Sequence, residues 1–331
     1  MNRRFYHRIV NVTLFLITAI PLSAYPLLVS GHLQTRFVST DYDEVENDHS
    51  TNSSFTVPRA CIAVSKRLNR QIGVSALLHA VPNPHLMEAY AMYTTDVAEA
   101  RFGLSRIPFG YEAPLSSAKL ITLERSEVTR RLIEPFAYDR GAYLTYRPDG
   151  PWSIAAGIVN GSTAQTSTDP DERKNVTAHI QYTRDTLNVG ASAYAGTLPT
   201  DTDACCEQET DKPAGPPENA WRYGADAELI YGRLTAIGEV LIGDTGGITA
   251  RGGYLTVAYH TPNNRYLPYC RVEQYDPNTA IDGDRFRRVT LGCRRYLSSP
   301  SARVSIEYAL TDNRLHPKQN DSLTGQYEII F

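Results

Sequence analysis

Eight charged side chains crowd into the segment 109–138, and their chemistry is electrostatic. In chain order they are Glu112, Lys119, Glu124, Arg125, Glu127, Arg130, Arg131 and Glu134. Fixed charges at this density either act on mobile ions nearby or pair with one another and hold the segment in place. Four of the eight are basic and four are acidic, so composition alone does not decide between these two uses.

The sequence contains no comparable cluster of residues that could carry out covalent catalysis. The chain has eight histidines but no GxSxG, HExxH or paired-histidine motif to supply a nucleophile, a metal pair or a positioned base. His179 and His260 are expected to be solvated wall residues. The acidic run Thr166 to Glu172 could hold calcium, but a solvated charge run is the commoner explanation. No catalytic residue, cofactor site or metal site is predicted.

The five cysteines fit neither a disulfide framework nor a zinc site, because their number is odd and no CxxC pair occurs. Cys205 and Cys206 adjoin each other in a polar, proline-rich stretch. Cys270 and Cys293 could lie on neighbouring strands, which would permit one bridge. The preferred interpretation is that all five are free thiols.

The first 31 residues read as a secretory signal peptide. Arg3, Arg4 and Arg8 precede an uncharged run over 9–20, and small residues follow around Ala24 and Gly31. A membrane anchor is the alternative, but a spanning helix needs about 20 continuous apolar residues. We therefore expect export, cleavage after Ala24 or Gly31, and one mature domain over 32–331.

The mature composition argues against a surface that binds polyanions. Removing the three leading arginines leaves 30 basic against 36 acidic residues, so no nucleic-acid partner is expected. Tyrosine outnumbers phenylalanine by 21 to 9. Tyrosine suits a boundary between apolar surroundings and water, because its ring is apolar and its hydroxyl can hydrogen-bond to water.

Alternating segments of about ten residues recur along the mature chain, separated by turn residues. They predict sixteen strands, at 32–41, 55–68, 71–81, 85–94, 98–108, 139–147, 152–160, 175–184, 187–198, 221–232, 234–244, 251–261, 266–276, 286–298, 302–312 and 321–331. An even number is what a closed up-and-down barrel with both termini at one end requires.

The connections between these segments differ in length. Tight turns are predicted at 69–70, 82–84, 148–150, 185–186, 232–233 and 299–301, and longer polar loops at 42–54, 109–138, 161–174, 199–220, 277–285 and 313–320. Short turns at one end and long loops at the other are typical of outer-membrane barrels.

The last residues favour the same class of protein. Leu323, Gly325, Tyr327, Ile329 and Phe331 share one face of a period-two pattern, and the chain stops on an aromatic. In a soluble sandwich the apolar faces would form the core. In an outer-membrane barrel they meet lipid, while the charged faces line a watery lumen.

A family resemblance lies in the stretch from Arg101 to Glu112, then Ser116-Ser117, Ile121-Thr122 and 123–126. It continues through Asp139-Arg140-Gly141 and 152–161, and upstream through Val57-Pro58-Arg59-Ala60. Together these segments resemble the phosphate-selective porin O and P family. The likeness runs from about residue 33 to Phe331 and is most specific across 98–162.

The resemblance implies an all-β fold, namely a closed antiparallel transmembrane barrel of about sixteen strands, commonly trimeric, with a long loop folded into the lumen. In this chain that loop is 109–138. Its charged residues then form the pore constriction, with Lys119, Arg130 and Arg131 facing permeant ions, and Glu112, Glu124 and Arg125 favoured as anchors. The lumen wall is expected to carry Arg222, Arg288, Arg294, Arg303 and Glu307.

The implied function is passive diffusion of small hydrophilic solutes or ions through the bacterial outer membrane, without a cofactor. The partners expected are solutes, outer-membrane lipid and two further copies of the chain. The chain departs from phosphate-selecting members in having only five lysines, so weak ion preference is expected. A non-conducting surface barrel, acting as an adhesin or anchor, is the alternative, and an enzyme comes third.

Overall fold

The structure is a computed structural model that describes residues 25–43, 49–81, 83–162, 169, 171–199, 217–297, 301–313 and 321–331. The basic and apolar start of the chain, and the pair Cys205-Cys206, lie outside these ranges. No helix in the described ranges is long and apolar enough to cross a membrane.

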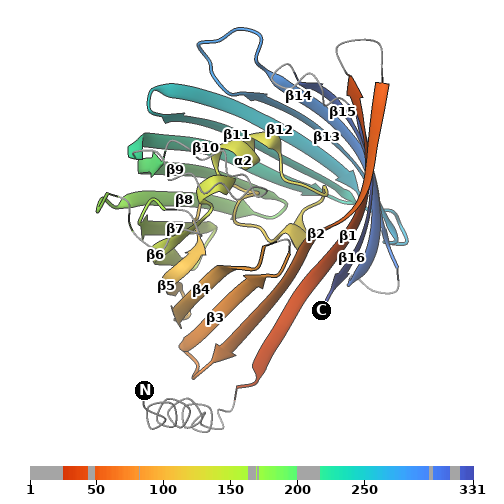
Figure 1. Ribbon diagram of the computed structural model, residues 1–331. Coiled ribbons are helices and arrows are strands. Elements are labelled where there is room, and N and C mark those ends of the chain that lie inside the picture. The colour runs from red at the N-terminus through yellow and green to blue at the C-terminus, as the bar shows by residue number, and fades with distance from the viewer. Residues whose placement is uncertain are drawn as a thin grey trace, which may run out of the picture.

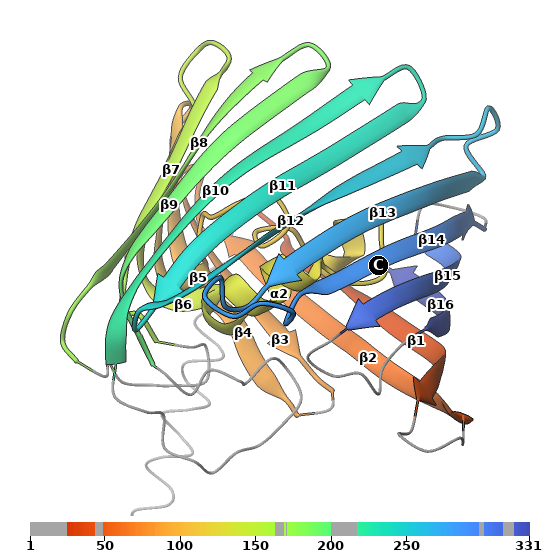
Figure 2. The ribbon, with the colours of Figure 1, turned by 90° about the horizontal axis from the view of Figure 1, so that it is seen from above.

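Sixteen antiparallel strands form one closed barrel, in which β1 pairs with β16 (Figures 1 and 2). The strands are β1 (Leu27–Asp43), β2 (His49–Arg67), β3 (Ile72–His79), β4 (His85–Thr94), β5 (Ala98–Arg106), β6 (Tyr138–Tyr146), β7 (Trp152–Val159), β8 (Asn175–Arg184), β9 (Leu187–Pro199), β10 (Pro217–Tyr231), β11 (Leu234–Thr245), β12 (Ile248–Tyr259), β13 (Tyr266–Asp276), β14 (Phe286–Tyr296), β15 (Ala302–Asn313) and β16 (Ser322–Ile330). The predicted fold class and strand number are confirmed.

The period-two pattern sorts side chains between the two faces of the wall. On β15, Val304 and Ile306 are exposed on the outer face, whereas Arg303 and Ser305 are buried on the inner face. A closed sheet of sixteen strands leaves room inside for charged groups and water. The apolar alternation is therefore a lipid-facing surface, and the charged alternation faces the lumen.

An aromatic girdle surrounds the end of the barrel that carries the short turns and the C terminus. Its exposed rings lie at strand ends and belong to Tyr93, Tyr146, Trp152, Tyr231, Tyr259, Tyr266 and Phe331. Aromatic side chains of this kind lie at the boundary between lipid hydrocarbon and water in outer-membrane barrels. The girdle therefore marks the periplasmic edge of the apolar band.

One prediction about the connections is wrong, and the predicted difference in length between the two ends holds only in part. The loop expected over 42–54 is mostly strand, because β1 continues to Asp43 and β2 already begins at His49. Short connections also occur at the long-loop end, at 80–84 and at Gly246-Gly247. Both glycines have positive φ, as a two-residue turn of type I′ requires, so this hairpin closes without a long loop.

The barrel closes where the two ends of the described chain meet. The Gly31 amide donates to the Phe331 carbonyl at 2.8 Å, and the Phe331 amide donates back at 3.0 Å. A Cβ on Gly31 would collide with the Cys61 carbonyl and lie 2.8 Å from the Phe331 ring. The terminal aromatic therefore packs into a space that only glycine leaves open.

Replacing Gly31 by alanine should weaken this closure. Overpacking of a tight contact costs about 1–3 kcal/mol, so we expect a smaller folded, heat-modifiable fraction on a gel. Gly325→Ala on β16 is the matched control, because a Cβ there meets nothing within 4 Å. Equal folding of the two variants would show that the Gly31 contact does not limit closure.

The cysteine bridge left open by the sequence does not form. Cys270 and Cys293 do lie on the neighbouring strands β13 and β14, but Cys270 pairs with Leu291 and Cys293 with Pro268. Both thiols, like that of Cys61, are free. The offset of two positions explains this, because bridged cysteines need Cα atoms within about 7 Å.

Candidate functional site

Residues 107–137, here named the inner loop, connect β5 to β6 and lie inside the barrel (Figure 2). The loop contains η1 (Ser117–Lys119), α2 (Glu127–Leu132) and η2 (Glu134–Phe136). The Ser126 hydroxyl accepts from the Thr129 amide and so caps the start of α2. Val128 and Leu132 of this helix belong to an apolar cluster with residues of β9 to β14.

Arginines on the inner face of the wall donate to backbone carbonyls of the inner loop. Arg303 reaches the Ala118 carbonyl at 2.6 Å, and Arg294 reaches those of Leu120 and Ile121, both at 2.9 Å. Arg271 and Arg222 do the same for Glu124 at 3.1 Å and Leu132 at 3.3 Å. Arg222, Arg294 and Arg303 thus lie on the inner face of the wall, and they hold the loop.

Carboxylates on the same wall accept from backbone amides of the loop. Glu239 accepts from Tyr111 at 2.9 Å, Glu307 from Leu123 at 2.7 Å and Glu273 from Glu127 at 2.6 Å. A buried irregular segment must satisfy both its N–H and C=O groups. The mixture of arginine and glutamate along the lumenal faces therefore supplies donors and acceptors for one piece of backbone.

Glu112 and Arg271 form an ion pair in which both side chains are almost fully buried. Glu112 also accepts from the Ser126 amide at 2.7 Å, which ties the start of the loop to the cap of α2. Arg125 donates to the Glu112 carbonyl at 3.1 Å and pairs with Glu134 at 2.9 Å. The structure therefore places Glu112 and Arg125 within the packing of the loop.

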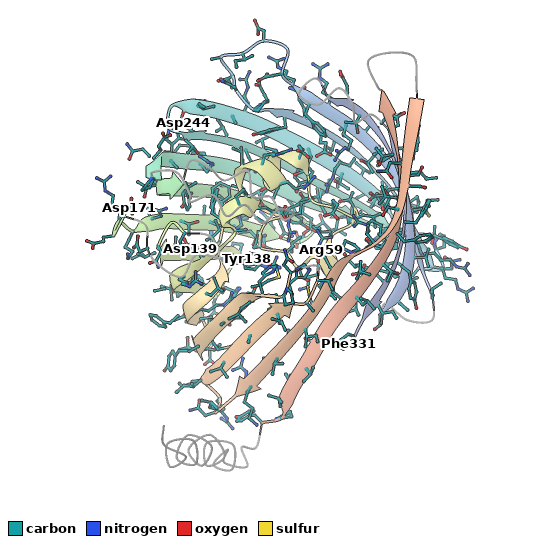
Figure 3. The ribbon with its side chains drawn as sticks, viewed as in Figure 1. Arg59, Tyr138, Asp139, Asp171, Asp244 and Phe331 are labelled. Atoms are coloured by element: carbon teal, nitrogen blue, oxygen red, sulfur yellow. The ribbon has the colours of Figure 1, made fainter. Side chains whose placement is uncertain are left out.

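Glu124 lies between two arginines of the first strands. Its Oε1 is 2.8 Å from Arg36 Nη2, and its Oε2 is 2.5 Å from Arg59 Nη2. Arg59 lies in the interior of the barrel (Figure 3). Burial acts to raise the pKa of Glu124, but Arg59, Arg36 and Arg130 outweigh it and hold the pKa well below its ordinary value.

Arg36 and Arg59 were not among the site residues predicted from the sequence. The family resemblance includes Arg59 but gives it no role at the site. The available signal is the alternation of the first two strands, since Gln34 pairs with Arg59 and shares its face of β1 with Arg36. Pairing β1 with β2 so that their polar faces coincide would have placed both arginines on the inner wall, beside the inner loop.

The basic residues predicted to face ions are the more exposed ones. Arg130 and Arg131 project from α2, and both pair with the buried Glu127 at 3.3 and 2.7 Å. Burial acts to raise the pKa of Glu127, whereas Arg130, Arg131 and Arg288 lower it, and the net pKa is lowered. Lys119 is exposed at the end of η1 and lines a cavity of about 370 Å³ with Arg271, Arg294 and Arg303.

His179 and the described part of the acidic run have ordinary surroundings, whereas 166–168 and 170 lie outside the described residues. His179 Nε2 lies 3.1 Å from Asp226 Oδ2, and His260 lines the same cavity as Lys119. Asp169 pairs with Lys174. Within the part of the chain that the structure describes, no group of three or more His, Cys, Asp or Glu side chains could hold a metal ion.

Comparison with known proteins places these features in context. The family model for phosphate-selective porin O and P matches residues 32–322. No curated protein matches the sequence.

Solved structures with a similar fold include an anion-selective porin from Comamonas acidovorans, with a TM-score of 0.69, 12% identity, and 93% of this chain and 100% of that chain covered. OmpT of Vibrio cholerae, in a trimer form, has a TM-score of 0.64 and 14% identity over 93% and 100% of the two chains. The channel DcaP of Acinetobacter baumannii has a TM-score of 0.64 and 10% identity over 93% and 97%. At these identities the likeness shows the fold alone.

Proposed function

The chain belongs to the phosphate-selective porin O and P family and is an outer-membrane porin, and we propose that it passes small hydrophilic solutes with a preference for anions. Selection rests on size and fixed charge, and no covalent step is involved. The inner loop narrows the passage, so charges on it act on ions at short range and in a reduced dielectric.

One observation carries the preference for anions: at α2 and on the wall beside it, the arginine is the more exposed partner of its ion pair. The side chains are 34% and 7% exposed for Arg130 and Glu127, 40% and 7% for Arg131 and Glu127, and 25% and 3% for Arg288 and Glu273. In these three pairs the guanidinium group is the more accessible charge. A permeant ion therefore meets positive charge first.

The proposal also covers the signal-peptide cleavage site, the oligomeric state and the contact with lipid. Cleavage after Ala24 is favoured over cleavage after Gly31, because β1 already pairs with β2 from Leu27 onward and the Gly31 amide contributes to barrel closure. A homotrimer is supported by the OmpT structure, which is described as a trimer form. The barrel meets outer-membrane lipid through its apolar outer face.

Single-channel recording in a planar bilayer under a salt gradient tests the proposal. Wild-type protein should give conductance steps with a reversal potential on the anion side. Replacing Lys119, Arg130 and Arg131 together by glutamate should move the preference toward cations by roughly tenfold or more, because each reversal counts as two charges near the ion path.

The control for this experiment reverses three charges elsewhere. Arg184, Arg233 and Arg265 lie exposed at the turn end of the barrel, and their replacement by glutamate should change the preference much less. Conductance with no response to the inner-loop variant would contradict the anion proposal. Folded, heat-modifiable protein that gives no conductance would favour the non-conducting surface barrel.

A further inference from the structure

The cavity that Lys119 lines has a volume of about 370 Å³ and lies between the inner loop and the inner faces of β10 to β15. Several of its wall residues, such as Ile230, Thr235 and Leu267, belong to the ends of strands next to the short turns. Small-molecule sites span about 300–1,000 Å³. The cavity is therefore large enough for one small solute on the turn side of the inner loop.

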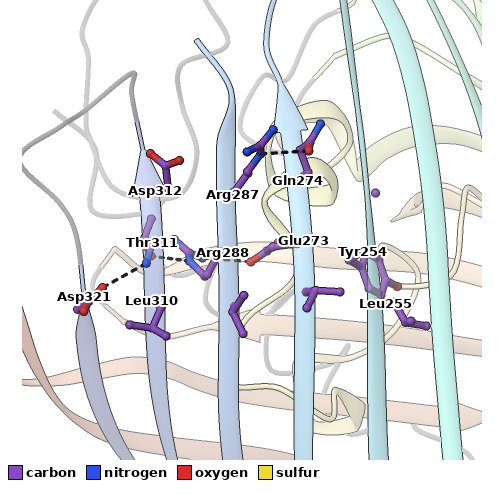
Figure 4. A pocket seen from close by; sticks show the side chains of 13 residues that line it. Tyr254, Leu255, Glu273, Gln274, Arg287, Arg288, Leu310, Thr311, Asp312 and Asp321 are labelled. Carbon is purple, nitrogen blue, oxygen red and sulfur yellow. Dashed lines mark hydrogen bonds and ion pairs between the residues drawn. The ribbon is translucent and has the colours of Figure 1, made fainter. Parts of the chain in front are cut away.

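A larger hollow of about 690 Å³ lies along β12 to β15 (Figure 4). Two of the arginines that line it already have partners. Arg288 lies 3.5 Å from Glu273, and Arg287 donates to Gln274 at 3.3 Å, as Figure 4 shows. These arginines are engaged within the wall, so the smaller cavity is the place to look for charges that a solute can reach.

The positive charge open to a solute in the smaller cavity is that of Lys119. Of the lysine and arginine residues in the lining, all of which the structure describes, only Lys119 is exposed. Arg271, Arg294 and Arg303 are buried and donate to backbone carbonyls of the inner loop. The ammonium group of Lys119 therefore keeps N–H donors for a solute carboxylate.

The negative charge open to a solute is that of Glu228 on β10. Its Oε1 accepts from the Tyr111 hydroxyl at 2.8 Å, and its Oε2 accepts from Asn188 Nδ2 at 2.7 Å. Both donors are neutral, and across the described ranges neither Glu228 nor Lys119 forms an ion pair. A carboxylate has about four acceptor positions. Glu228 therefore keeps an uncompensated charge and room for a cationic group.

The cavity also has an accessible apolar side. Ile230 follows Glu228 by two residues on the same inner face of β10, and it is 44% exposed. Ile121 of the inner loop and Tyr296 of β14 border the same cavity and are half-buried. Covering an apolar side chain such as that of Ile230 is favourable in water. The lining therefore presents one cation, one anion and one apolar surface to the same small volume.

We propose that this cavity is a subsite for a neutral α-amino acid with an aliphatic side chain. Its carboxylate lies on Lys119, its ammonium group on Glu228 and its side chain against Ile230. An organic anion would bring its charge toward Glu228, and an uncharged sugar would leave both charges without a partner. The inference rests on the proposed function, because Lys119 belongs to the ion path assigned there.

Titration of leucine into the single-channel recording in potassium chloride tests this assignment. Leucine has no net charge at neutral pH, so a saturable fall in conductance reports occupancy of the channel. Glu228→Gln and Lys119→Gln should each raise the half-blocking concentration by about tenfold, the order expected for a hydrogen bond to a charged group. Ile230→Ser should bring the value for leucine close to that for alanine.

Matched controls remove the same charges outside the cavity. Asp185 lies at the turn between β8 and β9 with a side chain that is 87% exposed, and Lys174 is 48% exposed beside Asp169. Asp185→Asn and Lys174→Gln should leave the half-blocking concentration unchanged. If they raise it as much as the cavity variants do, net charge explains the block and the assignment is wrong.

Modified ligands decide the assignment on the wild-type protein, even where a variant fails to fold. N-Acetylleucine lacks the ammonium group and leucinamide lacks the carboxylate, so both should block several-fold more weakly than leucine. Equal or tighter block by N-acetylleucine would overturn the role of Glu228. Normal salt conductance without any block by leucine would overturn this inference alone. Folded protein without conductance would overturn the proposed function, and this inference with it.

Discussion

Replacing Arg271 by alanine should release the inner loop and raise the single-channel conductance several-fold. The guanidinium of Arg271 joins three partners, namely the Glu112 carboxylate, the Glu124 carbonyl and the Thr256 hydroxyl. Removing one member of a buried ion pair costs about 3–5 kcal/mol, because the other charge stays buried without its partner. The conductance should therefore rise, and the temperature of heat modification should fall.

The double variant Arg271→Ala/Glu112→Ala separates a charge effect from lost packing. Removing both charges leaves no orphaned carboxylate, so the double variant should recover part of the stability that the single variant loses. Arg101→Ala is the control, because Arg101 pairs with the wall residue Glu99 at 2.7 Å. If the double variant were as unstable as Arg271→Ala, the orphaned charge of Glu112 would not explain the loss.

Replacing Glu124 by glutamine should increase the preference for anions. Glu124 reverses the order of exposure found at α2: its side chain is 34% exposed, whereas those of Arg36 and Arg59 are 11% and 18% exposed. Neutralising it leaves two arginines facing the passage. A unit charge about 5 Å from an ion acts with about 1–3 kcal/mol at effective dielectric constants between about 80 and 20, so the permeability ratio should change several-fold.

Glu99→Gln is the matched control for this change, because it also removes one carboxylate from an ion pair with arginine on the inner wall. A shift of the same size in both variants would mean that only total lumenal charge matters. The shift caused by Glu124→Gln should be the same at neutral pH and at about pH 5, since an ordinary glutamate titrates near 4.3. Because the pKa of Glu124 is lowered, Glu124 is charged at both of these pH values and becomes neutral only at lower pH.

The sequence predicted the barrel well because each strand carries its own signal. Alternation within about ten residues is local, and the side to which Val304 or Arg303 points follows from it directly. The boundaries of β1 and β2 were predicted less well. Polar residues such as Ser50 to Ser54 resemble a loop, but they pair with β1 over their length.

The interaction partner of each charged side chain could not be predicted in the same way. Arg303 and Ala118 are 185 residues apart, and Glu307 and Leu123 are 184 residues apart, yet both pairs are in contact. Their approach depends on how the inner loop crosses the closed barrel, and no local pattern encodes that path. The alternation assigns Arg222, Arg294 and Arg303 to a face of the wall, and only the three-dimensional structure shows which loop carbonyls they contact.

The way the wall holds the inner loop has a consequence for how such channels diversify. Arg222, Arg294 and Arg303 contact carbonyl oxygens, and Glu239, Glu273 and Glu307 contact amide hydrogens. Every residue except proline offers both groups, so this attachment is indifferent to the side chains of the loop. Lys119, Arg130 or Arg131 can therefore be exchanged by mutation or by design while the scaffold stays in place, and a new permeability can arise without a new fold.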